Sequence, residues 1–232
     1  MGALSSSAAL ELWELGASLH PLDQGLLALG LANPSTTIDF ADLPLGHRNL
    51  ALLDLHSSWF GPELQAWTAC PDCDEKVEFE LDARQLAATG HDSQAPESVR
   101  VGEFTFRLPT SRDIAHVVTA AEGASIGLLE HCRTAGPENS TWTVEMLEAV
   151  EERMAIEDPL AEPRLALSCP SCGREWEDTF DIGRFLWAEV ETRARRILWE
   201  VHALATAYGW SESETLALSS GRRVMYLQMV HG

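Results

Sequence analysis

The sequence predicts an α+β, helix-rich fold in which a small antiparallel β element lies between N-terminal helices and a long C-terminal helical region. Apolar residues recur at helical spacing near both ends of the chain, whereas the middle contains short segments of apolar–polar alternation. Two Cys-Pro-x-Cys motifs stand in the middle part, each just before an alternating segment. With 232 residues, of which 45% are hydrophobic, the chain is long enough to bury a sizeable core.

The N-terminal part has the pattern of consecutive helices. Residues 10–32 carry apolar side chains at helical spacing, and Pro21 suits the first turn of a second helix. Residues 47–60 place leucines near one helical face, and Gly61 with Pro62 ends this segment. We therefore expect a helical arm before the first cysteine motif.

The middle of the chain alternates between strands, loops and helices. Strict alternation over residues 76–82 predicts a half-buried strand. Residues 88–100 are polar and rich in turn formers, which predicts a loop, and residues 101–108 alternate again. Helical spacing follows over residues 112–122 and again over residues 144–157, where Asp-Pro breaks the pattern.

The strongest helical pattern covers residues 184–208. One face carries an apolar stripe, and the opposite face has two pairs at i,i+4 spacing for ion pairs, Glu189 with Arg193 and Glu191 with Arg195. Gly209 is placed to end this helix, and Ser211 with Glu214 forms a capping box for the next one. A final helix is expected over residues 222–230.

The two cysteine motifs belong to an internal repeat. The segment from Cys70 to Asp82 can be laid over the segment from Cys169 to Asp181 without a gap. The repeat keeps both cysteines, the proline between them and two acids in register, Glu78 with Glu177 and Asp82 with Asp181. Each copy therefore predicts a hairpin that presents two thiols.

Four thiols from two such hairpins are the donor set of a structural zinc site. Two thiolates three positions apart in a tight turn can face one cation, and two copies supply the four sulfurs of a closed tetrahedral site. We predict that Cys70, Cys73, Cys169 and Cys172 bind one structural Zn²⁺ in a zinc-ribbon-like β element. Such a site leaves no open position for catalysis.

Two other interpretations of the cysteines remain open. Each pair can be an independent redox or disulfide pair, although a thioredoxin-type motif opens a helix after a strand, whereas these motifs precede strands. The four thiols can also be plain buried side chains. The fifth cysteine, Cys132, is expected to be a buried small apolar residue.

These patterns divide the chain into four parts of one cooperative domain. They are a flexible N-terminus (1–10), an N-terminal helical arm (11–62), the zinc-ribbon-like element with an inserted strand and helices (63–183), and C-terminal helices (184–232).

Composition and missing motifs exclude several classes of function. A formal charge of -20, from 36 acidic and 16 basic residues, repels phosphate backbones and anionic lipid. No signal-peptide pattern or membrane-length apolar run occurs, so we expect a cytoplasmic protein. The chain also lacks Walker-type, GxSxG, HExxH and dinucleotide-binding patterns, so we expect neither an enzyme nor a small-molecule substrate.

The order of several motifs along the chain resembles one protein family. These are HPLDQGLLAL, FGPEL, the first CPxC, RLPTSRDI, DPLAEPRLALSCPSC, FDIGRFLW, EVHALATAYGWSE and LSSGRR. The order resembles the baseplate hub assembly chaperone family of T-even-type contractile-tailed phages, in the branch found with phage-tail-like contractile injection systems. The resemblance spans most of residues 11–230 and is most specific over residues 158–223.

The resemblance implies a non-enzymatic accessory protein of baseplate assembly that acts on baseplate, hub or spike proteins in the cytoplasm. It supplies no binding residues. Two hypotheses compete with it on the cysteine motifs alone. One is a zinc-ribbon adaptor for another protein, a transcription complex or nucleic acid, although the net charge opposes nucleic acid. The other is a thiol-disulfide oxidoreductase that uses either motif.

Overall fold

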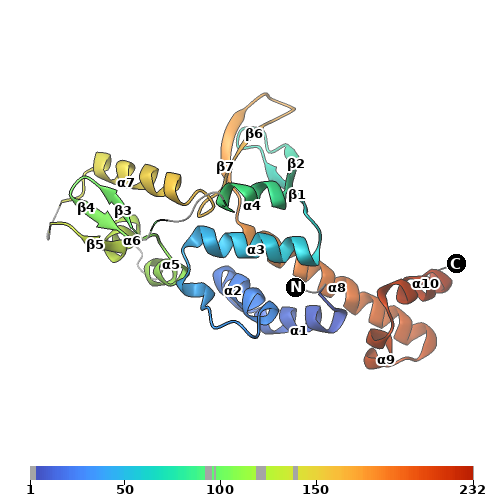
Figure 1. The fold of residues 1–232 in the computed structure, drawn as a ribbon. Coiled ribbons are helices and arrows are strands. Elements are labelled where there is room, and N and C mark those ends of the chain that lie inside the picture. The colour runs from blue at the N-terminus through green and yellow to red at the C-terminus, as the bar shows by residue number, and fades with distance from the viewer. Residues whose placement is uncertain (1–3, 92–95, 97, 119–123, 138–140, 232) are drawn as a thin grey trace.

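The computed structural model describes residues 4–91, 96, 98–118, 124–137 and 141–231 (Figure 1). Its helices are α1 (Ser6–Gly16), α2 (Pro21–Ala32), the 3-10 helix η1 (Phe40–Asp42), α3 (Leu45–Trp59), α4 (Ala83–His91), α5 (Ser111–Val118), α6 (Ala124–Cys132), α7 (Val144–Glu157), α8 (Ile182–Tyr208), α9 (Glu212–Ala217) and α10 (Ser220–His231). Its strands are β1 (Glu63–Ala69), β2 (Lys76–Asp82), β3 (Val99–Val101), β4 (Phe104–Phe106), β5 (Arg133–Ala135), β6 (Arg164–Ser168) and β7 (Glu175–Thr179). The predicted α+β, helix-rich class is confirmed.

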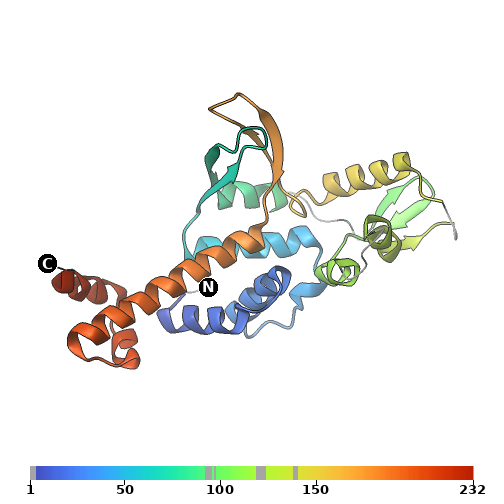
Figure 2. The same ribbon diagram turned by 180° about the vertical axis from the view of Figure 1, so that it is seen from behind.

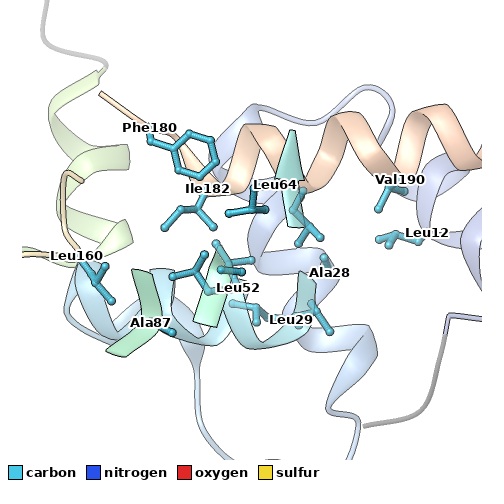
Figure 3. Packing of buried hydrophobic residues seen from close by; sticks show 14 residues of the cluster. Leu12, Ala28, Leu29, Leu52, Leu64, Ala87, Leu160, Phe180, Ile182 and Val190 are labelled. Carbon is cyan, nitrogen blue, oxygen red and sulfur yellow. The ribbon is translucent and has the colours of Figure 1, made fainter. Parts of the chain in front are cut away.

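The central body is a group of helices around one apolar core. Side chains from α1, α2, α3, α4 and the first half of α8 meet there, together with Leu64 of β1 (Figure 3). Leu160 and Phe180, which flank the second hairpin in sequence, join the same cluster. The base of each hairpin is therefore embedded in the helical body, and burial of these side chains contributes about 1.5–3 kcal/mol each.

The strands form three small antiparallel sheets. In the first hairpin β1 pairs with β2, with Trp67 opposite Glu78, and in the second β6 pairs with β7. Both hairpins project from the same side of the helical body, above α4 (Figures 1 and 2). The third sheet, in the order β3-β4-β5, lies in the insertion between the two hairpins.

The insertion has an apolar cluster of its own. Phe104 and Phe106 of β4 pack with Leu129 of α6 and Val150 of α7, and the Trp142 ring lies against both phenylalanines. This unit lies at one end of the molecule, whereas α9 and α10 lie at the other (Figures 1 and 2). The chain thus leaves the central body after α4, folds the insertion and returns to start the second hairpin.

The C-terminal helices follow the predicted signals. Gly209 ends α8 with a left-handed φ of 70°, and Ser211 with Glu214 forms the capping box of α9. Arg223 of α10 donates to Glu200 of α8 at 2.9 Å and to the Ser6 hydroxyl at 2.7 Å. Because Glu200 and Arg223 are almost fully buried, this ion pair connects α10, α8 and the start of α1.

The first helix begins inside the segment over residues 1–10 that was predicted to be a flexible N-terminus. The Ser5 hydroxyl accepts from the backbone amide of Ala8, so α1 begins at Ser6. Leu4 is buried, and its carbonyl accepts from Arg193 of α8 at 2.8 Å. Arg193 therefore bonds to this carbonyl and does not form the predicted ion pair with Glu189. The other predicted pair is confirmed, with Arg195 at 2.7 Å from Glu191.

Two predictions for the middle of the chain also need correction. The loop expected from residue 88 begins later, because α4 runs to His91 after Asp82 accepts from the amides of Arg84 and Gln85. Residues 101–108 do not form one strand. Gly102, with a φ of 59°, makes the turn between β3 and β4.

One buried carboxylate joins the second hairpin to the N-terminal arm. The backbone amide of Gly46 donates to Asp158 Oδ2 at 3.0 Å, and Asn49 donates to the Leu160 carbonyl at 2.7 Å. Burial raises the pKa of Asp158, and the Gly46 amide and nearby cations act against this. A Cβ atom at Gly46 would lie 1.7 Å from Asp158 Oδ1, so the contact requires glycine.

We therefore expect Gly46→Ala to lower the free energy of unfolding by about 2–3 kcal/mol, because the methyl group displaces a buried hydrogen-bonded carboxylate. The matched control is Gly30→Ala in α2, where a Cβ atom would meet no atom within 4 Å. The control should be neutral or stabilising by up to about 1 kcal/mol. Urea unfolding of both variants checks this, and equal stabilities would contradict the role of Gly46.

A second buried carboxylate, Asp113, fixes the start of α5. Arg107 donates to both of its oxygens at 2.6 and 2.7 Å, and the amide and hydroxyl of Thr110 donate at 2.8 and 2.7 Å. Burial alone raises the pKa of Asp113, but these hydrogen bonds and the Arg107 charge outweigh it and lower the pKa to about 2. The side chain of Asp113 is only 2% exposed.

Acid should therefore weaken the fold through Asp113. Its carboxyl has an ordinary pKa of 3.8 and a folded pKa of about 2, so it contributes about 2 kcal/mol above pH ~4. This contribution is lost as the pH falls through the folded value. Asp113→Asn should lower stability at pH 6 and flatten the acid dependence of urea unfolding, whereas Asp54→Asn, at an exposed position of α3, should leave stability at pH 6 unchanged.

Candidate metal centre

Each cysteine motif forms the tip of a hairpin with the same backbone geometry. The amide of Cys70 donates to the Glu75 carbonyl at 2.9 Å, and the amide of Asp74 donates to the Cys70 carbonyl at 3.0 Å. In the second hairpin, Cys169 donates to Arg174 at 2.8 Å and Gly173 donates to Cys169 at 3.0 Å. The residue after the second cysteine is left-handed in both, with φ of 58° at Asp74 and 73° at Gly173.

The tips of the two hairpins bring all four predicted cysteines together. The sulfurs of Cys70 and Cys172 are 3.7 Å apart, those of Cys73 and Cys169 are 3.6 Å apart, and all four lie within 4.8 Å of one another. A disulfide needs about 2.05 Å, so none of these pairs is bonded. A tetrahedral site with metal–sulfur distances of about 2.3 Å has sulfur–sulfur edges of about 3.8 Å, close to the two observed separations.

Burial differs within each pair in the same way. Cys70 and Cys169 are buried against Val77 and Trp176, whereas Cys73 and Cys172 are exposed. The first cysteine of each motif is therefore covered by the hairpins, whereas the second is accessible to solvent although its sulfur lies within the cluster. These four cysteines form a cluster that can hold one metal ion at the outer end of the hairpins.

Hydrogen bonds distribute protons unequally over the four sulfurs. Backbone amides of Cys172 and Ser171 donate to the Cys169 sulfur and lower the pKa of this thiol to about 7. At Cys73 the Glu75 amide lowers the pKa, but hydrogen bonds with the other cysteine sulfurs prevail and raise it to about 12. Four thiols this close cannot all ionise unless a cation balances the charge, so metal binding must displace protons.

The setting of the motifs bears on the redox interpretation. A thioredoxin-type pair stands at a helix N-terminus after a strand, whereas each pair here stands in the turn between two antiparallel strands. The fifth cysteine, Cys132, lies at the end of α6 outside the cluster and is fully buried, as predicted. Burial raises the pKa of Cys132 to about 11, which keeps this thiol protonated.

The structural repeat is longer than the cysteine motif. In both copies the aspartate nine residues after the second cysteine caps the helix that follows, Asp82 for α4 and Asp181 for α8. Both hairpin bases are closed by a proline carbonyl, with Ala83 donating to Pro62 at 2.8 Å and Phe180 donating to Pro163 at 2.9 Å. The repeated unit is therefore hairpin, aspartate cap and helix.

Polar contacts between the hairpins add to this arrangement. The Thr68 hydroxyl donates to Asp178 at 3.0 Å, and Arg174 lies 3.8 Å from Asp72. The repeat in the sequence indicates the cysteines and the aspartates of this unit, but it predicts no role for Thr68 or Asp178. Asp178 stands at an inward position of β7, and an acid at such a position is the signal that could have indicated a polar partner across the interface.

Comparison with protein-family models, with curated proteins and with solved structures finds no significant match to the chain. Among the described residues, no helix combines the length and the apolar character that crossing a bilayer requires. The geometry of the cysteine cluster therefore carries the description of the site.

The shared centre predicts one metal ion per chain, measured by inductively coupled plasma mass spectrometry. Cys73→Ser and Cys172→Ser should each remove most of the bound metal, because each takes one of the four sulfurs from the same ion. The control Cys132→Ala removes a thiol outside the cluster and should keep full occupancy. Two ions per wild-type chain, or unchanged occupancy in either serine variant, would show that the hairpins do not share a site.

Proposed function

We propose that the chain is a non-enzymatic assembly chaperone or accessory structural protein of the baseplate or hub of a contractile phage tail or phage-tail-like injection system. We further propose that the metal held by its four cysteines is a structural Zn²⁺. The partners are baseplate, hub or spike proteins, and the assembly takes place in the cytoplasm.

The donor set supports zinc. Four thiolates in a tetrahedral arrangement are typical of structural zinc. The filled d shell of Zn²⁺ imposes no other geometry, and zinc binds soft sulfur donors well. All four positions are supplied by cysteine, so substrate or water has no coordination position to occupy. This closed donor set supports a role in holding the hairpins together instead of a catalytic one.

The order of the motifs along the sequence carries the proposal for the baseplate. Segments that carry the family resemblance, although distant in sequence, line one cavity of about 500 Å³ where α2, α3 and α8 begin. The lining includes His20 and Pro21 of HPLDQ, Ile114 of RLPTSRDI, and Asp181 to Arg184 of FDIGRFLW. Several of these motifs, although separated in sequence, therefore meet around one cavity of the folded chain.

A zinc-ribbon adaptor that binds another protein complex is the second candidate. The observation that favours it is Trp67, a tryptophan that is 62% exposed on the first hairpin. The net charge of -20 argues against nucleic acid as the partner. The turn setting of both cysteine pairs argues against the thiol-disulfide oxidoreductase.

Removing the metal tests the structural role of zinc. A chelator should lower the melting temperature strongly, because structural zinc supplies about 10 kcal/mol or more of apparent binding free energy. Hydrogen exchange should rise first in β1 and β7, which the Thr68–Asp178 hydrogen bond joins, and zinc should restore both properties. If purified protein contains iron or no metal, or if chelation leaves melting unchanged, the zinc proposal is wrong.

Co-purification tests the baseplate proposal. The tagged full-length chain, expressed with a complete contractile-tail operon, should recover baseplate, hub or spike subunits, identified by mass spectrometry. A tagged unrelated acidic protein controls for charge-driven recovery. Particles assembled without this chain should lack a complete baseplate in electron micrographs. Normal particles without it, together with no recovered tail subunit, would contradict the proposal.

A further inference from the structure

The first hairpin has an outer face that turns away from the second hairpin. We define this outer face by its six central residues, Gln65, Trp67 and Ala69 on β1 and Lys76, Glu78 and Glu80 on β2. All six are exposed, and Trp67, at 62%, is the most exposed aromatic side chain among the described residues. A tryptophan exposed on a sheet does not contribute the free energy that burial of its large apolar ring would give, so the fold does not explain why tryptophan stands here.

The internal repeat shows that the hairpin fold does not require this tryptophan. Three positions before the first cysteine, the second hairpin has Ala166 where the first has Trp67, and both residues point outward. Three positions after the second cysteine it has Glu175 where the first has Lys76. The second hairpin nevertheless forms the same turn and supplies the same two sulfurs.

The outer face already holds a cation. The ammonium of Lys76 lies 5.4 Å from the centroid of the Trp67 ring and donates to Glu78 Oε1 at 2.7 Å. An aromatic face with a carboxylate beside it is the arrangement that attracts ammonium and guanidinium groups. Lys76 is the only lysine in the chain. Because its side chain is 54% exposed, another cation can take its place on the Trp67 ring.

We propose that this outer face is a docking surface for an arginine-bearing segment of a partner protein. A guanidinium stacks flat on an indole and donates two parallel hydrogen bonds to a carboxylate, whereas an ammonium is a point charge. Glu78 lies directly opposite Trp67, and Glu80 lies on the same strand and face, so carboxylates are in place beside the ring. The net charge of -20 steers a basic segment toward the chain.

The inference of a docking surface rests on the proposed function only because it requires a protein partner. That partner can be a baseplate component or the partner of an adaptor. It adds the chemistry of recognition, which the family resemblance leaves open. It also gives Lys76 a role, because this side chain occupies the ring until the partner's arginine displaces it.

The test uses fluorescence anisotropy of a short labelled peptide of alternating arginine and glycine, with the zinc-loaded full chain. Trp67→Ala should weaken binding about fivefold, the range of a cation–π contact. Trp199→Ala, at another exposed tryptophan, should leave binding unchanged. Unchanged melting and metal content of Trp67→Ala, expected because Ala166 fills the equivalent position, show that the fold is intact.

A charge-matched pair tests the displacement of Lys76. Lys76→Ala should tighten peptide binding more than Arg164→Ala, which removes one exposed positive charge from the outer face of the second hairpin. The corresponding lysine peptide should bind more weakly than the arginine peptide. The proposal is overturned if the wild-type chain does not bind the arginine peptide at low salt, or if Trp67→Ala binds as well as wild type. Equal effects of Trp67→Ala and Trp199→Ala would overturn it too.

Repeating the co-purification with Trp67→Ala separates this inference from the proposed function. If tail subunits are recovered equally with wild type and variant, the docking surface is wrong while the baseplate role stands. If peptide binding depends on Trp67 but no tail subunit is ever recovered, the surface stands and the baseplate role fails.

Discussion

The meeting of four thiols at the tips of two hairpins is the constraint on which the rest of the structure depends. Cys70 and Cys73 are separated from Cys169 and Cys172 by an insertion with a sheet, three helices and a core of its own. Sulfurs within 4.8 Å of one another repel once ionised, so the hairpins can be held tip to tip only if protons or a cation balance the charge. A metal ion bound at this point would hold the two hairpins, and with them both ends of the insertion, relative to the helical body.

The insertion is held from the other side by polar contacts that need no metal. Leu45 of α3 donates to the Pro109 carbonyl, Arg112 pairs with Asp39 and Asp42 of the N-terminal arm, and the Gly46 amide donates to Asp158 just after α7. The N-terminal arm therefore contacts both ends of the inserted unit. The cysteine cluster at the hairpin tips and a buried carboxylate at the hairpin base thus lie on two sides of the inserted unit.

Local signals in the sequence predicted much of the fold. Pro21, Gly209 and the Ser211–Glu214 box act within a single turn, so their effects can be recognised without the rest of the chain. The cysteine cluster was predictable for another reason. Two copies of Cys-Pro-x-Cys with the same spacing supply four thiols, and a single site shared by both copies is the arrangement that four thiols favour. The sequence does not predict helix α4 because the segment has few apolar residues. Its start depends on the cap formed by Asp82, and the repeat shows only that this aspartate has a counterpart in Asp181.

Long-range contacts explain the other differences. Arg193 has a glutamate at the right spacing on its own helix, yet it bonds the Leu4 carbonyl, 189 positions away. Arg223 likewise reaches the Ser6 hydroxyl from α10, and no local sequence pattern predicts either contact. The Thr68–Asp178 contact between the hairpins is of the same kind. Sequence periodicity predicts which face of an element is buried but not which polar group across the interface becomes its partner.

The two hairpins have arms of unequal length, with consequences for how such a unit can evolve. From the closing proline to the first cysteine there are eight positions in the first hairpin and six in the second. The returning segment from the second cysteine to the capping aspartate has nine positions in both, but strand pairing extends to Asp82 in the first hairpin and only to Thr179 in the second. Two residues extend a strand by about 7 Å and keep every side chain on its own face, whereas one residue would exchange the faces. Viable insertions and deletions in the outgoing arm should therefore add or remove two residues at a time, because only such a change keeps its outward and inward side chains on their own faces.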